Sequence, residues 1–536
     1  MKVRTANCPA CAGPIEFKVS SSLVTVCEFC HSVVARGDKQ PEDHGKVADL
    51  VELKSPLMLG MTGRFRDRRF EVVGRVQYQH PSGATWNEWY LLLVGETWGW
   101  LAEAQGRLYL MFERRLKATA AMPAFEAIQL GQTFDLMKGK FTVSEKGTAH
   151  VRSAEGEIPW AVRPGLEHRY ADLRGDQKGF ATLDYGTGTG TATVFVGVAV
   201  TAEDLQLSGK VGWVSNDSIP VGALQINCPQ CAGTLTLHVP DETLRVACPN
   251  CRALLDADHG KLKFLKSLAH KHTNLVIPLG AQGTLKGERY TAIGFMERYV
   301  LYEGKTYPWT EYLLHNPRAG FRWLVSNADH WSFVEPIDFP ATATMKDEVH
   351  YDGRTFRKYD QGTAHVRFVV GEFPWRVMVG ETVQTQDFIA PPHMISIEHS
   401  LQMNTPAQPH DIDHAGRSSV AAEEINVSLG TYIPIEELEQ AFAIKALKRP
   451  WGVGTIQPAP SPGFVMYASY MGFLALILAT FMGMYAIHPN NPPDSSLMLL
   501  AMGLVSIIPI GVQVYRHAFE VKRWEHSDFS PYVQES

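Results

Sequence analysis

The sequence predicts a mainly β protein that contains one unit twice and ends in an α-helical hairpin suited to a membrane. Three observations lead to this fold class: a duplicated set of motifs, four CxxC pairs, and two long uncharged apolar stretches near the C-terminal end. The chain has 536 residues, too many for one hydrophobic core. Hydrophobic residues make up 45% and charged residues 20%, which is a globular composition and excludes a mainly disordered chain.

The duplication is visible in several motifs that occur in the same order in both halves. CPACAGPIEFKV begins at Cys8, and CPQCAGTLTLHV begins at Cys228. GTAHVRSAEGEIPW at residues 147–160 matches GTAHVRFVVGEFPW at residues 362–375 without a gap. WNEWYLL and WTEYLL form a further matching pair. Each half is therefore a cysteine-rich ribbon followed by one module.

Between these motifs the pattern predicts β-strands. Runs such as RRFEVVGRVQY, EWYLLLV and AHVRFVV are short, rich in β-branched and aromatic residues, and separated by glycine-containing turns. A module of this length can form one sandwich or two small barrels. We favour small barrels or rolls, because each module has two strand-rich halves that meet near residues 120–135 or 340–350.

The predicted domains follow from these boundaries. They are zinc ribbon 1 (1–45), β-rich module 1 (56–207), zinc ribbon 2 (221–265), β-rich module 2 (276–440), a linker (441–463), the transmembrane hairpin (464–516) and a tail (517–536). One helix is predicted before the hairpin, in PIEELEQAFAIKALK from Pro434, because Leu438, Phe442 and Ile444 share a face.

The eight cysteines form two groups with the spacing of four-cysteine zinc sites. Fifteen residues separate the pairs of the first group and sixteen those of the second: Cys8, Cys11, Cys27 and Cys30, then Cys228, Cys231, Cys248 and Cys251. Four thiolates complete a tetrahedral shell around Zn²⁺ and leave no position for water, so we expect two structural sites. Redox CxxC pairs would require a βαβ context, which is missing. Iron in a rubredoxin-like site stays open as an alternative.

The charge pattern does not favour nucleic acid as the partner of the ribbons. The formal net charge is −6, and the first ribbon carries few basic residues, among them Arg4, Lys18 and Arg36, which Glu16, Glu28 and Asp38 offset. A basic face interleaved with aromatic residues, typical of nucleic-acid readers, is absent from both ribbons. Protein docking or structural support is favoured, and a membrane-tethered nucleic-acid-binding protein is the alternative.

Two stretches near the end of the chain predict membrane-spanning helices. Residues 464–487 and 497–515 contain no charge, and each is long enough to cross about 30 Å of hydrocarbon. The short loop between them has no Lys or Arg, whereas basic residues flank the hairpin on both sides: Lys445, Lys448, Arg449, Arg516, Lys522 and Arg523. The positive-inside rule places both chain ends in the cytoplasm. The N-terminal residues contain no apolar run, so we expect no secretory signal peptide.

A second candidate site lies in the repeated GTAHVR and GExPW motifs. A pocket of His, Glu and Trp could hold a cationic ligand such as a polyamine, and the residues would be His150, Glu157, Trp160, His365, Glu372 and Trp375. The alternative is a strand–turn–strand in which Pro and Trp pack on the sheet, and we favour it. The sequence shows no nucleophile elbow, HExxH motif, phosphate-binding loop or dinucleotide fingerprint. We therefore predict no catalytic residues, while an enzyme without a recognisable motif stays open.

These motifs together resemble one bacterial family. CPxCAG followed by CxxC, an LGxxG start, W-x-E-Y/W, GTAHVR and GExPW are similar to the domain of unknown function 4178, in two copies. The resemblance implies no established activity. It implies an association with polyamine-synthesis enzymes and with membrane-stress proteins of the phage-shock type, and hence the bacterial inner membrane. We expect a non-enzymatic, membrane-anchored scaffold that faces the cytoplasm and binds partner proteins or a small ligand.

Overall fold

The computed structural model describes most of the chain, and the account below concerns these residues alone. They are residues 4–17, 22–35, 42–46, 55–80, 84–95, 97–104, 106–115, 122–137, 139–160, 162–163, 165–176, 178–187, 191–208, 224–240, 242–258, 261–268, 275–341, 345–400, 423–445, 447–460, 463–491 and 493–532. Strands dominate both modules, and the long helices come at the end of the chain, as the sequence predicts.

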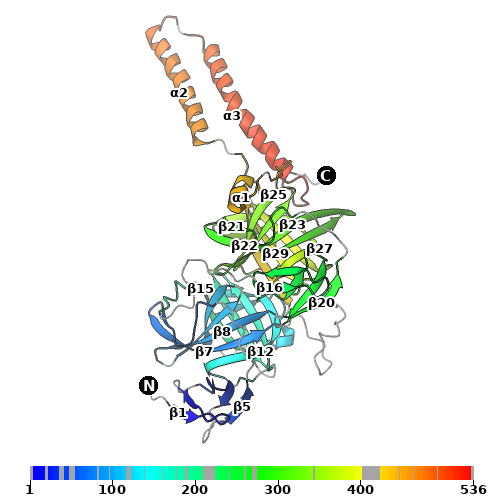
Figure 1. Cartoon of the computed structure of the whole chain (residues 1–536). Helices are drawn as coiled ribbons and strands as arrows, with labels where there is room; N and C mark the ends of the chain where they lie inside the picture. Colours follow the sequence, from blue (N-terminus) through cyan, green and yellow to red (C-terminus); the bar gives the residue numbers. More distant parts are fainter. Residues whose placement is uncertain are drawn as a thin grey trace.

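Module 1, drawn in blue to cyan in Figure 1, is built almost entirely from β-strands, which close into a ring of antiparallel pairs. Its elements are β6 (Thr62–Phe65), β7 (Arg68–Gln79), β8 (Thr85–Leu93), β9 (Thr97–Ala104), β10 (Arg107–Arg114), the 3₁₀ turn η2 (Phe125–Ala127), β11 (Thr133–Leu136), β12 (Gly139–Ile158), β13 (Glu167–Gly175), β14 (Gly179–Gly186) and β15 (Thr193–Val200). In the described residues, hydrogen-bonded neighbours run β7–β8–β9–β10–β15–β14–β13–β12 and back to β7. β6 and β11 extend the ring as hairpin strands.

Module 2 repeats this order strand by strand. It contains β21 (Gln282–Leu285), β22 (Glu288–Tyr302), β23 (Lys305–Asn316), β24 (Gly320–Asn327), β25 (His330–Pro336), β26 (Glu348–Tyr351), β27 (Arg354–Phe373), β28 (Thr382–Ala390), β29 (His393–Ser400) and β30 (Glu423–Ile433). The ring runs β22–β23–β24–β25–β30–β29–β28–β27 and back to β22. The duplication seen in the sequence is thus a duplication of topology.

The two halves of a module are not separate barrels, which differs from the arrangement that we favoured. β12 pairs with β13 from Phe141 to His150 and with β7 from His150 to Gly156, so one long strand belongs to both halves. The β10–β15 pairing joins the halves on the other side. This closure satisfies backbone groups that separate half-sheets would leave at open edges. Each half nevertheless keeps its own apolar clusters.

Each ribbon is built from short hairpins, and one of its strands pairs with a strand of its module. Ribbon 1 has β1 (Arg4–Asn7), β2 (Pro14–Phe17), β3 (Val24–Val26), β4 (Ser32–Ala35) and β5 (Glu42–Lys46); ribbon 2 has β16 (Leu224–Asn227), β17 (Thr234–Leu237), β18 (Arg245–Ala247), β19 (Ala253–Asp258) and β20 (Lys261–Ser267). β3 pairs with the end of β12, and β18 pairs with the end of β27. The ribbons therefore share backbone hydrogen bonds with the modules that follow them in the chain.

The two modules also contact each other directly. β12 pairs with β30 at Glu145–Glu424 and Lys146–Glu423. Asp338, which follows β25 in module 2, accepts hydrogen bonds in module 1 from Arg107 (3.1 Å) and from the hydroxyl of Tyr109 (2.9 Å). The modules consequently share a polar junction.

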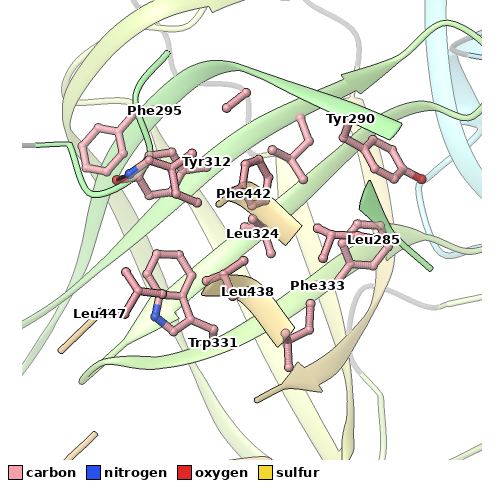
Figure 2. Packing of buried hydrophobic residues seen from close by; sticks show 14 of the residues in the cluster. Leu285, Tyr290, Phe295, Tyr312, Leu324, Trp331, Phe333, Leu438, Phe442 and Leu447 are labelled. Carbon is pink, nitrogen blue, oxygen red and sulfur yellow. Dashed lines mark hydrogen bonds between the residues drawn. The ribbon is translucent and has the colours of Figure 1, made fainter. Parts of the chain in front are cut away.

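A short helix closes one side of module 2. α1 (Ile435–Phe442) buries Leu438 and Phe442 against strand residues that include Trp331 and Phe333, as Figure 2 shows. Ala443 adopts a left-handed conformation (φ 52°) and ends the helix. Ile444, predicted to share the helix face, packs at the edge of the same cluster from beyond the helix end.

Two long helices project from the modules as a hairpin (Figure 1). α2 (Phe464–Ile487) and α3 (Ser495–Arg523) are long and apolar enough to cross a membrane. In the described part of their apolar segments, the side chains are largely exposed, in contrast to a core helix of a soluble protein. Asp494 caps α3 by accepting a hydrogen bond from the Ser496 amide (2.9 Å), and Pro509 lies inside the helix.

The last turns of α3 dock onto module 2. The guanidinium of Arg523 is buried and donates to the carbonyl oxygens of Gly454 (3.1 Å), Thr455 (2.8 Å) and Gln457 (2.6 Å). The Tyr359 hydroxyl, from β27, donates to the Arg523 carbonyl oxygen (2.9 Å). The Pro/Gly-rich segment that the sequence marks as a linker therefore receives the end of the hairpin and ties it to module 2.

Candidate functional site

The first cysteine group converges at the tip of ribbon 1. The Sγ atoms of Cys8 and Cys30 lie 3.7 Å apart, and those of Cys11 and Cys27 lie 3.7 Å apart. All four Sγ atoms lie within 4.8 Å of one another. Each CxxC turn is closed by backbone hydrogen bonds, such as Ala12 N–H to the Cys8 carbonyl (2.8 Å).

The second group has the same geometry. The Sγ atoms of Cys228 and Cys251 are 3.7 Å apart, and those of Cys231 and Cys248 are 3.9 Å apart. A tetrahedral site with metal–sulfur bonds of about 2.3 Å requires sulfur–sulfur separations of about 3.8 Å. Both groups therefore fit a four-thiolate metal site, and each could hold one ion.

The glycine after the first CxxC pair allows a close approach within the ribbon. A Cβ atom on Gly13 would lie 2.7 Å from the Phe29 ring, and one on Gly233 would lie 2.6 Å from the Asn250 side chain. The left-handed residue of the turn is instead the preceding alanine, Ala12 (φ 59°) or Ala232 (φ 56°). These glycines thus let the second CxxC turn close over the first.

The glutamate of GExPW binds the ribbon in both copies. Glu372 is 2% exposed, and its carboxylate accepts hydrogen bonds from the amides of His238 (2.7 Å) and Val239 (3.0 Å) and from the Thr243 hydroxyl (3.0 Å). Glu157 accepts a hydrogen bond from the Ser22 hydroxyl (2.6 Å). The repeated glutamates hold the ribbons onto the modules.

The other residues of the predicted His–Glu–Trp pocket are placed apart. His150 is exposed on β12, and His365 stacks on Tyr299 with ring centroids 5.0 Å apart. The Trp160 indole donates to the Tyr90 hydroxyl (2.6 Å), and the Trp375 ring packs edge-on against Trp323 (5.5 Å). Neither copy therefore brings its histidine, glutamate and tryptophan together around one cavity.

A different polar region, which our sequence reading did not single out, lies along a cavity of about 1430 Å³ that both modules line. In module 1, the side chains of Glu145 and Asp172 face it from β12 and β13, which pair at these two residues. Burial and the neighbouring Glu145 raise the pKa of Asp172 to about 7, although the Thr182 hydroxyl donates to its carboxylate (2.7 Å). The hydroxyl of Tyr170 donates to Glu145.

Module 2 repeats this acidic pair. Asp360 and Asp387 pair across β27 and β28 and line the same cavity. Burial raises the pKa of Asp387 to about 7, against the lowering effect of a hydrogen bond from Ser396. Glu424, at the junction of the modules, likewise has its pKa raised to about 7 by burial and by Glu145. The cavity wall therefore carries several carboxyl groups whose protons are held more tightly than in water.

The W-x-E motif contributes a further buried carboxyl group in each module. The Trp86 indole donates to Glu88 (3.3 Å), and the Trp309 indole donates to Glu311 (2.6 Å). All four residues line the cavity. Sequence analysis used this motif only to align the two halves of the chain. The feature that could have indicated a site is a glutamate that both copies retain within an otherwise apolar strand.

The fold and these sites define a class of protein: a duplicated chain of cysteine ribbons and closed β modules that carries an apolar helical hairpin. The sequence model described as "Domain of unknown function (DUF4178)" matches residues 58–202 and 278–434. The chain belongs to this family, with two copies of the domain.

The remaining comparisons add no argument about function. No curated protein matches the chain. A solved structure titled "The complex structure of Pseudomonas aeruginosa MucA/MucB" has 10% sequence identity, covers 72% of this chain and 95% of that chain, and gives a TM-score of 0.09. A similarity of that size carries no conclusion about fold or function.

Proposed function

We propose that this protein is a non-enzymatic, membrane-anchored scaffold that presents two β modules, and the cavity they line, to ligands or partner proteins at the cytoplasmic face of a bacterial inner membrane. The observation that carries the proposal is the junction of hairpin and module. The buried Arg523 at the end of α3 bonds three carbonyl groups beside module 2, so the apolar hairpin and the modules form a connected unit.

The cysteine groups supply structural support in this proposal. Each would hold one Zn²⁺, because its four sulfur atoms have the spacing of a closed tetrahedral shell. Such a shell stabilises a ribbon too small to fold on its apolar core alone. Eight cysteines that form no disulfide fit the reducing cytoplasm.

The orientation of the hairpin is part of the proposal and rests on charge. Lys445, Lys448 and Arg449 precede α2, and Arg516 and Lys522 belong to the end of α3, whereas the loop between the helices has neither Lys nor Arg. Positively charged flanks favour the cytoplasmic side. Both chain ends, and with them the modules, would then face the cytoplasm.

Replacing residues 464–515 with a Gly/Ser linker tests the anchor. We expect the variant to leave the membrane fraction and to remain in the supernatant after ultracentrifugation, while its far-ultraviolet circular dichroism keeps the β signal of the modules. The full-length chain should resist extraction by alkaline carbonate and dissolve only in detergent. Pelleting of the folded variant with membranes would contradict the anchor.

Purification of the full-length chain in mild detergent tests the scaffold. We expect specific membrane or stress proteins to co-elute, with two Zn²⁺ per chain for the two cysteine groups. Nucleic acid that co-elutes without protein partners, and that salt removes, would contradict the scaffold and favour nucleic-acid binding by the ribbons.

A further inference from the structure

The acidic pair of module 1 has a third carboxyl group beside it, which module 2 supplies. Glu145 on β12 lies opposite Asp172 on β13. On its other side, Glu145 lies opposite Glu424, which belongs to β30 of module 2. Three neighbouring strands thus carry one row of carboxyl groups, Asp172, Glu145 and Glu424, and all three residues line the cavity. Like charges at directly opposed positions of a sheet destabilise the pairing of their strands.

The strand pairing that carries this row is short. In the part of the chain that the structure describes, β12 and β30 pair at two positions, Glu145–Glu424 and Lys146–Glu423. Lys146 and Glu423 lie on the other face of the strands, because successive side chains alternate, and Lys146 donates to the Ile128 carbonyl oxygen (3.0 Å). The repulsion is therefore confined to the face that carries the row, and few backbone hydrogen bonds oppose it.

The polar groups beside the row bring hydrogen bonds but little positive charge. The Tyr170 hydroxyl donates to Glu145, and the Thr182 hydroxyl donates to Asp172 (2.7 Å). The Nε2 atom of His80, which follows β7, lies 3.8 Å from Glu145, but burial lowers the pKa of His80. The His80 ring is therefore neutral near pH 7 and does not compensate the charge of Glu145 there.

Arg174, two positions along β13 from Asp172, is a cation beside the row. Its Nε atom lies 3.5 Å from Asp338, and its charge lowers the pKa of Asp172 and of Glu424. Burial and the neighbouring Glu145 outweigh Arg174, so the pKa of both carboxyl groups is raised to about 7. The acidic side chains of the next strands have partners of their own: Asp184 contacts His168 (3.5 Å), and Glu398 accepts a hydrogen bond from Arg298 (2.7 Å).

Three adjacent carboxyl groups in a wall of low dielectric constant cannot all ionise without strong mutual repulsion. We propose that this row makes the contact between the modules pH-sensitive: β12 and β30 pair while the row holds protons, and they separate as Glu145 and Glu424 both ionise. The contact of Asp338 with Arg107 joins opposite charges, so the modules stay connected there. The row lines the cavity, and its opening therefore changes the wall of the proposed ligand site.

The direction of the effect follows from proton binding. Glu424 has a pKa of about 7 in the closed junction, and a glutamate exposed to water has a pKa of about 4. The closed form therefore holds a proton that the open form has lost, and it is favoured at low pH. Each such group makes the closed form about tenfold less favoured per pH unit between about pH 4 and 7. Above that range both forms are ionised, and pH has no further effect.

Amide hydrogen exchange of the full-length protein in detergent, measured between pH 5 and pH 7.5, tests the proposal. Protection factors are compared, because they correct for the intrinsic pH dependence of amide exchange. We expect the protection of residues 423–424 to fall roughly ten- to hundredfold from pH 5 to pH 7. Residues 431–433 of the same strand pair with β25 and should keep their protection.

Two variants place the effect in the row. Glu424→Gln keeps the shape and removes the charge, and we expect residues 423–424 to stay protected over the whole pH range. Glu145→Gln should have the same effect from the other strand. Asp360→Asn is the matched control. Asp360 pairs with Asp387 in module 2 as Glu145 pairs with Asp172, and no described strand of module 1 pairs beside it, so this variant should keep the wild-type response.

Protection of residues 423–424 that does not change with pH in the wild type would overturn the inference, as would an undiminished pH response in a folded Glu424→Gln variant. If Glu424→Gln fails to fold, Glu145→Gln and the wild-type measurement decide the question. The exchange experiment requires neither a bilayer nor a ligand. Its failure therefore leaves the membrane anchor and the binding function untouched, and failure of either leaves this result untouched.

Discussion

Glu157 and Glu372 occupy one position in the two copies of GExPW, and in both copies the carboxylate bonds the ribbon. Glu88 and Glu311 occupy one position in the two copies of W-x-E, and there the copies differ because only Glu311 has an arginine partner. A repeated glutamate therefore anchors the ribbon in one motif and lines the cavity between the modules in the other. The difference depends on residues across the strand register, which a linear motif does not contain.

The role of the cysteines, in contrast, can be predicted from a linear motif. CxxC spacing determines the turn, and four sulfur atoms at that spacing can meet only around one centre, so the ligand sets could be predicted from local sequence. The raised pKa values of Asp172 and Asp387 could not be predicted, because both side chains line a cavity whose shape depends on how β13 and β28 pair with the long strands β12 and β27.

Asp387 predicts a pH dependence of stability. Its pKa in the folded protein is about 7, above the value of about 4 in an unfolded chain. The folded state therefore holds a proton that the unfolded state has lost, and the free energy of unfolding should fall as pH rises from about 4 to 7. Asp387→Asn removes this term, so the variant should gain roughly 1–3 kcal/mol relative to the wild type between pH 5 and pH 8.

Chemical denaturation in detergent at the two pH values measures this difference. The charged groups that influence the pKa of Asp387 are Asp360, Glu398 and Arg298, and none of them is altered in the variant. Asp67→Asn, at a fully exposed position, serves as control and should show the pH response of the wild type. An Asp387→Asn variant with that same response would refute the prediction.

Among the elements, the ribbons and the hairpin could be predicted because their signals are local: cysteine spacing in one case and uncharged length in the other. The strands could also be predicted, from the alternation of apolar and polar residues, whereas the closure of each module into a ring could not. The β10–β15 and β12–β7 pairings join segments far apart in the sequence, and a period of two does not specify a partner. We therefore predicted two small barrels or rolls in each module, where the structure has one ring.

Loss of a cysteine ligand should release one metal ion from its ribbon. We expect Cys228→Ser to lower the metal content from two ions per chain to one, with the two sites independent because they belong to different groups. Structural zinc contributes about 10 kcal/mol or more to folding of small zinc peptides, so ribbon 2 should lose its order and expose the end of β27. Plasma emission spectrometry and amide hydrogen exchange of residues 371–373 measure both effects.

Cys8→Ser is the matched variant for the other ribbon. It should also lower the content to one ion, while exchange at residues 371–373 stays as in the wild type, because β18 and not β3 pairs there. Two ions per chain in either variant would disprove the assignment of the ligands.

At the scale of the whole molecule, the hairpin and the modules are joined by a side chain whose role was not evident from sequence. Arg523 was counted among the basic residues that flank the hairpin, as Lys522 was. In the structure Arg523 is fully buried, whereas Lys522 is 58% exposed. Which of two adjacent basic residues faces module 2 is decided by the rotation of α3, and composition cannot give that rotation.

Arg523→Ala should loosen the base of the hairpin. Three carbonyl groups would lose a charged donor, which we expect to cost roughly 2–4 kcal/mol. Residues 454–457 should then exchange amide hydrogens faster and become accessible to protease. Lys522→Ala, the neighbouring exposed position, is the control and should change neither measurement; equal protection in both variants would show that Arg523 does not hold the junction.

The pairing of each ribbon with the far end of its module has a consequence for the order of biosynthesis. Ribbon 1 has all four ligands once Cys30 has been made, but β3 pairs with Glu157 and Ile158, which a ribosome produces more than a hundred residues later. Ribbon 2 waits in the same way for residues 371–373. A ribbon that folds before its module is made must therefore do so without these strand pairings, and a metal ion bound by its four cysteines would supply the missing stability.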